Sequence, residues 1–163
     1  MRTCRCATLR VVAPSESQNA LLSKTPAETA AFGARLAAKL AEGDIVFLKG
    51  GLGAGKTTLA RGLISAWTGT DDEVPSPTYT LVQTYSGPRG ELWHIDLYRL
   101  DDPDETLELG LEESGALLLI EWPERLGAHT PRDRIEIHLQ ERGAARLIEI
   151  MGVGRYKGVD FVG

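Results

Sequence analysis

The pattern of apolar and polar positions predicts short strands that alternate with helices. Residues 44–49 contain an apolar run that is typical of a short buried strand, and helical spacing follows from residue 58 to about Trp67. Residues 116–120 are apolar throughout, which predicts a strand covered on both faces, as in parallel sheets. Together these runs indicate an α/β fold: a mixed sheet with a central parallel part, flanked by helices and antiparallel hairpins.

A capped helix is expected before the first buried strand. Thr25 suits an N-cap, Pro26 fits the first turn, and a glutamate follows three residues after the cap. Apolar residues then recur at helical spacing, and Gly43 is expected to stop the helix. Nearer the N-terminus, residues 9–12 predict a short edge strand.

Period-two alternation in residues 79–85 and 91–97 predicts a β-hairpin. In its second strand, His94 and Asp96 share one face, while Trp93 lies on the other. Between the second helix and this hairpin, residues 69–78 are polar and contain two prolines, so regular structure is not expected there.

Toward the C-terminus, the pattern predicts two smaller elements and a tail. Residues 104–111 form a short helical piece interrupted by Gly110, and residues 135–139 alternate as one strand of a final antiparallel pair with the segment around Leu147. From Gly152 the chain has little core material, so a loosely attached tail is expected.

Length and charge narrow the classes of function. With 163 residues, of which 42% are hydrophobic, the chain can bury one core. The net charge of −5 argues against unaided, high-affinity nucleic-acid binding, which depends on neutralising phosphates. Any connection with RNA is therefore expected to run through a partner.

The N-terminal segment indicates a cytoplasmic protein. It lacks the apolar stretch and cleavage site of a secretory signal, and no run of residues is long and apolar enough to span a membrane. The two cysteines, Cys4 and Cys6, are too few for a zinc site and poorly spaced for a disulfide, so we interpret them as reduced thiols.

Residues 50–57 read Gly-Gly-Leu-Gly-Ala-Gly-Lys-Thr, a full match to the P-loop pattern G-x-x-x-x-G-K-[ST]. Glycines let the backbone aim N–H groups at phosphate oxygens, and the next helix adds the positive end of its dipole. Lys56 would reach the β- and γ-phosphates, and the Thr57 hydroxyl suits Mg²⁺. A glycine-rich turn with an exposed lysine is the alternative, but the strand and helix around the loop favour nucleoside triphosphate binding.

Two carboxylates are candidates for the acidic partner of the P-loop, because Mg²⁺ prefers hard oxygen ligands. Glu121 follows the apolar strand, at the carboxyl edge where open α/β sheets bind ligands. Asp96 would bind the metal or orient the attacking water. The alternatives are a Glu121 side chain that faces water and an Asp96 salt bridge to Arg99. The further acidic residues within 101–113 are interpreted as a solvated surface.

Other chemistry has weaker support. His94, His129 and His138 show no metal-ligand spacing, and we interpret each as structural or exposed rather than catalytic. The single asparagine, Asn19, precedes the P-loop, so the Asn-Lys-x-Asp loop that reads guanine in GTPases is absent and adenine is favoured.

Four segments together resemble the bacterial TsaE family, formerly called YjeE. They are residues 50–58, Ser76-Pro77-Thr78-Tyr79-Thr80-Leu81-Val82, His94-Ile95-Asp96-Leu97-Tyr98-Arg99-Leu100 and Ile120-Glu121-Trp122-Pro123. Their order and spacing also fit, over about residues 25–150. The resemblance implies a reduced P-loop ATPase needed for threonylcarbamoylation of adenosine 37 in tRNA. Its implied partners are TsaD, which transfers the threonylcarbamoyl group, and TsaB, the companion subunit of TsaD; tRNA is reached only through that complex.

The resemblance also implies roles for individual residues. Thr57 and Glu121 would hold Mg²⁺, Asp96 would serve hydrolysis and contribute to the metal site, and Lys56 would assist catalysis. Arg146 is the nearest match to the arginine that the family brings to the nucleotide, and Arg142 is the alternative. The residues expected to bind ATP are Gly50, Gly53, Ala54, Gly55, Lys56, Thr57, Thr58, Thr25, Pro26, Thr29, Thr78, Trp122 and Arg146.

The chain departs from the family pattern in two places, and two alternative functions remain. Gly51 stands where the family often has an acidic residue, and the Arg-rich leader and the tail lie outside the pattern. A small-molecule kinase or an ATP-dependent switch module would also use a P-loop, although no lid-sized insertion supports a kinase. We expect a leader at residues 1–24, a P-loop ATPase domain at 25–151 and a tail at 152–163.

Overall fold

The computed structural model describes residues 19–70 and 74–163. The strands of its mixed sheet are β1 (Ala20–Ser23), β2 (Ile45–Lys49), β3 (Val82–Gly87), β4 (Gly90–Asp96), β5 (Leu117–Glu121), β6 (Arg134–Arg142) and β7 (Ala145–Val153). The helices are α1 (Pro26–Ala37) and α2 (Lys56–Thr68), with 3₁₀ segments η1 (Pro103–Leu109), η2 (Pro123–His129) and η3 (Gly154–Tyr156). Among the described residues, no helix has the length and apolar character needed to cross a membrane.

The sheet has the predicted central parallel part. Its strand order is β1-β7-β6-β2-β5-β4-β3, and the neighbouring strands β6, β2, β5 and β4 run parallel. The β3–β4 and β6–β7 hairpins extend it on either side as antiparallel pairs. The fold class expected from the sequence is therefore confirmed.

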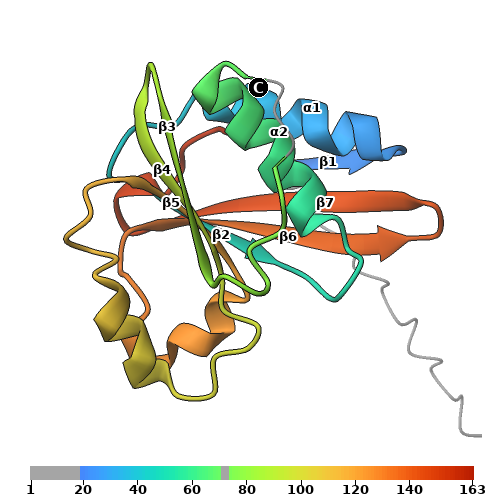
Figure 1. The fold of residues 1–163 in the computed structure, drawn as a ribbon. Coiled ribbons are helices and arrows are strands. Elements are labelled where there is room, and N and C mark those ends of the chain that lie inside the picture. The colour runs from blue at the N-terminus through green and yellow to red at the C-terminus, as the bar shows by residue number, and fades with distance from the viewer. Residues whose placement is uncertain (1–18, 71–73) are drawn as a thin grey trace, which may run out of the picture.

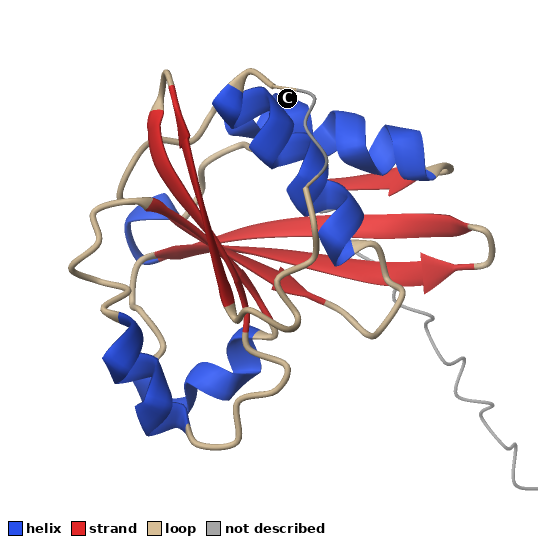
Figure 2. Ribbon diagram, in the orientation of Figure 1, coloured by secondary structure: helices blue, strands red, loops and turns tan. Residues whose placement is uncertain are grey.

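Two layers cover the sheet on opposite faces. Helices α1 and α2 lie together on one face, while η1 and η2 lie on the other (Figure 1), as the colouring by secondary structure in Figure 2 also shows. Gly33 and Gly62 let the two helices cross closely, because a Cβ at either position would collide with the backbone of the facing helix. The face covered by α1 and α2, called the helix-covered face below, carries the larger apolar core. The P-loop leads into α2 on this side of the sheet.

Some predicted boundaries were wrong for local reasons. Helix α1 begins after the expected cap, since Thr25 Oγ1 accepts the Glu28 N–H at 3.1 Å, but it ends at Ala37 rather than at Gly43. Tight i→i+3 hydrogen bonds of the 3₁₀ type carry the chain on to Leu40. Strand β3 begins three residues later than expected, because residues 77–81 form a turn in which Leu81 has a positive φ of 66°.

The edges of the sheet also differ from the expectation. The edge strand expected at residues 9–12 lies outside the described residues, whereas Ala20–Ser23 forms edge strand β1 and pairs antiparallel with β7. The prediction of a loosely attached tail was wrong. Phe161 is 3% exposed within the main core, and its N–H donates to Asn19 Oδ1 at 3.1 Å. Tyr156 and Val162 also pack against this core, so several apolar side chains anchor the segment.

A buried ion network joins β2 to β6 directly before the P-loop. Glu136 is 3% exposed and accepts hydrogen bonds from Lys49 Nζ at 2.8 Å and Arg134 Nε at 2.7 Å, with His138 Nε2 at 3.4 Å. Burial by itself raises the pKa of Glu136, but the hydrogen bonds from these three side chains outweigh that effect and lower the pKa to about 2. The network therefore favours an ionised carboxylate on β6, beside the strand that leads into the loop.

The Glu136 network predicts a defined dependence of stability on pH. A carboxylate whose pKa is lower in the folded chain stabilises it above the ordinary value of 4.5, and this contribution is lost as pH falls toward about 2. We expect Glu136→Gln to lower the free energy of unfolding at pH 7 by on the order of 2 kcal/mol. The variant should also lose less stability between pH 5 and 3 than the parent, as measured by urea unfolding. Glu108→Gln, at an exposed glutamate, is the control; equal pH slopes in parent and Glu136→Gln would contradict this assignment.

Candidate functional site

The P-loop links the end of β2 to the start of α2, as its sequence requires. Gly50 has φ 146°, and a Cβ there would lie 2.5 Å from the Leu139 carbonyl oxygen of β6, so only glycine fits this close passage. Gly55 is the N-cap of α2 in a left-handed conformation, and no side chain within the described structure caps this helix. The first amide groups of α2 are thus available to an anionic ligand.

Lys56 lies inside the loop rather than in solvent. It is 5% exposed, and its Nζ donates to the carbonyl oxygens of Gly50 at 2.7 Å and Gly51 at 2.8 Å. The same ammonium lies 4.1 Å from the centroid of the Trp122 ring. Burial lowers the pKa of Lys56, an effect that attraction to Glu121 and to nearby carboxylates opposes. A cation is therefore held where phosphate oxygens would meet it.

Glu121 meets the first turn of α2. It is 3% exposed and accepts a hydrogen bond from Thr57 Oγ1, with distances of 3.2 Å to Oε1 and 3.5 Å to Oε2. His94 Nε2 lies 2.9 Å from the same Oε1. The alternative of a strand-end glutamate facing water is wrong, because the carboxylate is buried between the sheet and the helix.

Asp96 lies beside Glu121 because the two residues are register partners on parallel strands β4 and β5. It is 4% exposed, and its carboxylate accepts hydrogen bonds from Thr78 Oγ1 and the Tyr98 N–H, both at 2.9 Å. The alternative salt bridge to Arg99 does not form, since the Arg99 guanidinium instead packs over the Tyr79 ring. Asp96 is thus held by neutral donors and faces the P-loop.

Two adjoining hollows surround the loop. The first, called the phosphate hollow because the sequence predicts phosphate binding there, is lined by Leu52, Gly53, Ala54, Gly55, Lys56, Thr57, Thr58, Ser76, Thr78, Asp96, Tyr98, Glu121 and Trp122. The second hollow is lined by Ser23, Thr25, Pro26, Thr29, Gly53, Gly55, Thr58, Ala144 and Arg146. They share Gly53, Gly55 and Thr58. Together they include every residue expected to bind nucleotide except Gly50, whose carbonyl oxygen instead accepts from Lys56.

The second hollow lies beside the P-loop, between the start of α1 and β7. Thr25 and Thr29 come from the start of α1, and Arg146 enters from β7, where its Nη2 donates to the Gly53 carbonyl at 3.3 Å. Arg142, the second arginine suggested by the sequence, does not line this hollow and donates to Gln140 Oε1. The structure thus brings Arg146, rather than Arg142, to the loop.

The sequence did not predict a contact between His94 and Glu121. The His94 side chain is fully buried and its Nε2 lies 2.9 Å from Glu121 Oε1, which fits the structural alternative rather than the exposed one. The alternation of β4 places His94 on the same face as Asp96. His129 instead pairs with Asp104 near the surface at 2.7 Å, and His138 belongs to the Glu136 network.

The oxygen ligands of the phosphate hollow fit Mg²⁺. In the part of the chain that the structure describes, no group of three or more His, Cys, Asp and Glu side chains could hold a metal. Mg²⁺ bound with a nucleotide needs fewer protein ligands, because phosphate oxygens and water complete its octahedral shell. The adjacent Thr57 hydroxyl and Glu121 carboxylate supply hard oxygen ligands of this kind, with Asp96 beside them.

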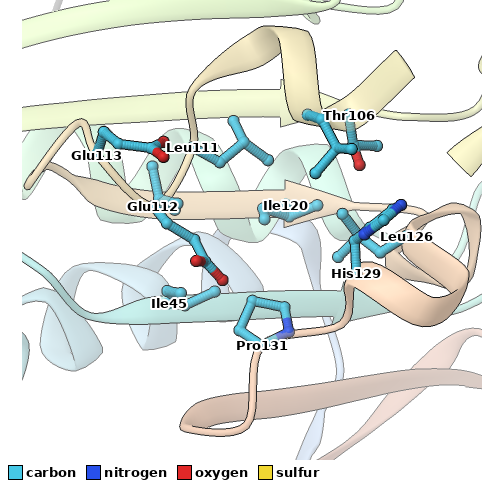
Figure 3. Close-up of a pocket in the computed structure, with 11 residues that line it drawn as sticks. Ile45, Thr106, Leu111, Glu112, Glu113, Ile120, Leu126, His129 and Pro131 are labelled. Atoms are coloured by element: carbon cyan, nitrogen blue, oxygen red, sulfur yellow. The ribbon is translucent and has the colours of Figure 1, made fainter. Parts of the chain in front are cut away.

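A further pocket lies on the opposite face of the sheet, away from the P-loop. Ile45 and Ile120 project into it from β2 and β5, while Glu112 and Glu113 lie toward one end and His129 toward the other (Figure 3). It contains none of the residues that the sequence predicted for nucleotide or metal. This pocket is thus separate from the residues predicted for the nucleotide site.

A comparison with protein families matches the same segments. The family model described as "Threonylcarbamoyl adenosine biosynthesis protein TsaE" matches residues 23–148, a span that includes the P-loop, Asp96, Glu121 and Trp122. The chain belongs to the TsaE family. The resemblance inferred from four motifs is confirmed, and membership of TsaE places the chain in the biosynthesis of threonylcarbamoyladenosine in tRNA.

Relatives and a solved structure agree with TsaE membership. The tRNA threonylcarbamoyladenosine biosynthesis protein TsaE of Rickettsia bellii is 45% identical over 115 residues, which cover 69% of this chain and 80% of that protein. The Haemophilus influenzae TsaE is 40% identical over 110 residues, covering 66% and 69% respectively. The crystal structure of Bacillus subtilis YdiB matches with a TM-score of 0.68 and 29% identity, over 83% of this chain and 85% of that one.

The contact between Lys56 and Trp122 predicts a fluorescence signal. A nucleotide phosphate would draw the Lys56 ammonium from its position 4.1 Å from the ring centroid, so adding ATP or ADP with Mg²⁺ should change tryptophan emission. We expect Trp122→Phe to abolish that change and Lys56→Ala to require far more nucleotide to produce it. Trp93→Phe, which alters a tryptophan that does not line the phosphate hollow, is the matched control. A signal that survives in Trp122→Phe would place the nucleotide elsewhere.

Proposed function

We propose that this chain binds ATP with Mg²⁺ and hydrolyses it to support tRNA threonylcarbamoylation by a TsaB–TsaD complex in the cytoplasm. The observation that carries this proposal is the register of β4 and β5, which sets Asp96 beside Glu121 at the mouth of the P-loop. Membership of the TsaE family supplies the pathway. The positions of the side chains around the P-loop support the roles proposed below for individual residues.

The phosphate groups would take over contacts that the protein now makes with itself. Lys56 Nζ is bonded to two loop carbonyls, and the β- and γ-phosphate oxygens are stronger acceptors for the same ammonium. The free amides at the start of α2 would cradle these oxygens. Thr57 and Glu121 would hold Mg²⁺, which would neutralise part of the phosphate charge.

Asp96 is the candidate for orienting the attacking water. Its carboxylate is fixed by Thr78 Oγ1 and the Tyr98 N–H, so little reorganisation is needed when a water binds to it. The water would attack the γ-phosphorus as the bond to the bridging oxygen of ADP breaks, releasing phosphate. A small-molecule kinase would transfer the phosphoryl group to another acceptor instead.

The segment around Thr78 would communicate the state of the nucleotide. Ser76 and Thr78 share a hydrogen bond of 2.8 Å and both line the phosphate hollow, where a γ-phosphate would compete for their hydroxyls. Loss of that phosphate would return Thr78 to Asp96, which provides a two-state contact for a partner to sense. Because the net charge is −5, contacts with tRNA are assigned to the partners.

The two carboxylates should fail in different ways. Asp96→Asn should lower the rate of phosphate release by on the order of 100-fold with nucleotide affinity nearly unchanged, because a water-orienting group acts mainly in the transition state. Glu121→Gln should instead raise the Mg²⁺ concentration needed for half-maximal activity. Both are measured by phosphate release, alone and with TsaB–TsaD, which should accelerate the parent.

The same assay separates the proposal from its rivals. A phosphorylated small molecule in place of free phosphate would indicate a kinase. Rapid hydrolysis by the isolated chain, unaffected by TsaB–TsaD, would contradict a partner-dependent ATPase. If Glu121→Gln lowers the maximal rate with no change in Mg²⁺ requirement, the roles of the two carboxylates have been exchanged.

A further inference from the structure

His94 is a buried polar side chain with a single hydrogen-bond partner. It is 0% exposed on the helix-covered face of β4, and its Nε2 lies 2.9 Å from Glu121 Oε1. Its Nδ1 is buried without a hydrogen-bond partner among the described residues. A buried imidazole with one unsatisfied nitrogen is costly, so an apolar residue would serve better if this position only filled space.

The two carboxylate oxygens of Glu121 have different hydrogen-bond partners. Oε1 accepts both from His94 Nε2 and, at 3.2 Å, from Thr57 Oγ1. Oε2 has only the longer contact of 3.5 Å with Thr57. The protein therefore secures one oxygen from two directions and leaves the other more available to a ligand.

We propose that His94 is a positioning residue whose Nε2–H bond holds the Glu121 carboxylate so that Oε2 faces Mg²⁺. This role rests on the proposed function, in which Glu121 and Thr57 hold the metal with the nucleotide. Hydrogen bonds from buried neighbours commonly orient metal-binding carboxylates, and their loss typically lowers metal affinity by roughly 10- to 100-fold. His94 would thus affect metal binding without touching the metal or the phosphates.

A matched pair of amides tests the hydrogen bond itself. The side-chain amide of His94→Gln places an N–H near the position of Nε2, whereas the shorter His94→Asn cannot reach Glu121. The measurement is Mn²⁺ affinity in the presence of ADP, from the electron paramagnetic resonance of free Mn²⁺. We expect His94→Asn to bind Mn²⁺ about tenfold more weakly and His94→Gln to remain near the parent. ADP affinity without metal should be unchanged in both.

The outcomes separate this proposal from the function on which it rests. Failure of the parent to bind Mn²⁺ with ADP would contradict the proposed metal site. If the parent binds and His94→Asn matches it, or both variants weaken equally, His94 has no positioning role. If thermal unfolding shows that His94→Asn is not folded, a measurement on the parent alone provides a second test. The His94 Nε2–H signal in nuclear magnetic resonance should shift with Mg²⁺ and ADP but not with ADP alone, and an unchanged signal would overturn the proposal.

Discussion

The parallel register of β4, β5 and β2 is the constraint on which the site depends. Asp96 pairs with Glu121, and Glu121 pairs with Leu48, so three strands end together at the edge where the chain enters the P-loop. Register partners on parallel strands point to the same face, and here that face meets the start of α2 with Lys56 and Thr57. A slip of one residue would turn Glu121 to the opposite face and separate it from the helix.

Burial strengthens the electrostatic interactions of the charged side chains in this site. Lys56, Asp96 and Glu121 are each 5% exposed or less, and isolated charges at such depth would be strongly unfavourable. Each is instead satisfied by hydrogen bonds: loop carbonyls for the lysine, Thr78 for the aspartate and His94 for one glutamate oxygen. In this low-dielectric setting, groups already oriented before a ligand arrives would interact with the charge of the proposed phosphate ligand more strongly than they would in water.

The parts of the fold and site that could be predicted from sequence are those with local causes. The P-loop around Lys56 is a contiguous motif, and the buried strand before Glu121 follows from an apolar run. The contact between His94 and Glu121 joins side chains 27 residues apart on adjacent strands, so spacing along the chain could not reveal it. The burial of Phe161 against a distant core and the left-handed conformation of Leu81 likewise depend on tertiary packing rather than on local preference.

We propose that ATP hydrolysis at this site lets the modification complex act repeatedly. The most direct measurement is the number of threonylcarbamoylated tRNA molecules formed per TsaB–TsaD complex when this chain and ATP are supplied together. The account predicts many rounds with the parent, but about one round with Asp96→Asn or with a non-hydrolysable ATP analogue. Repeated modification that continues unchanged with the variant or with the analogue would contradict it.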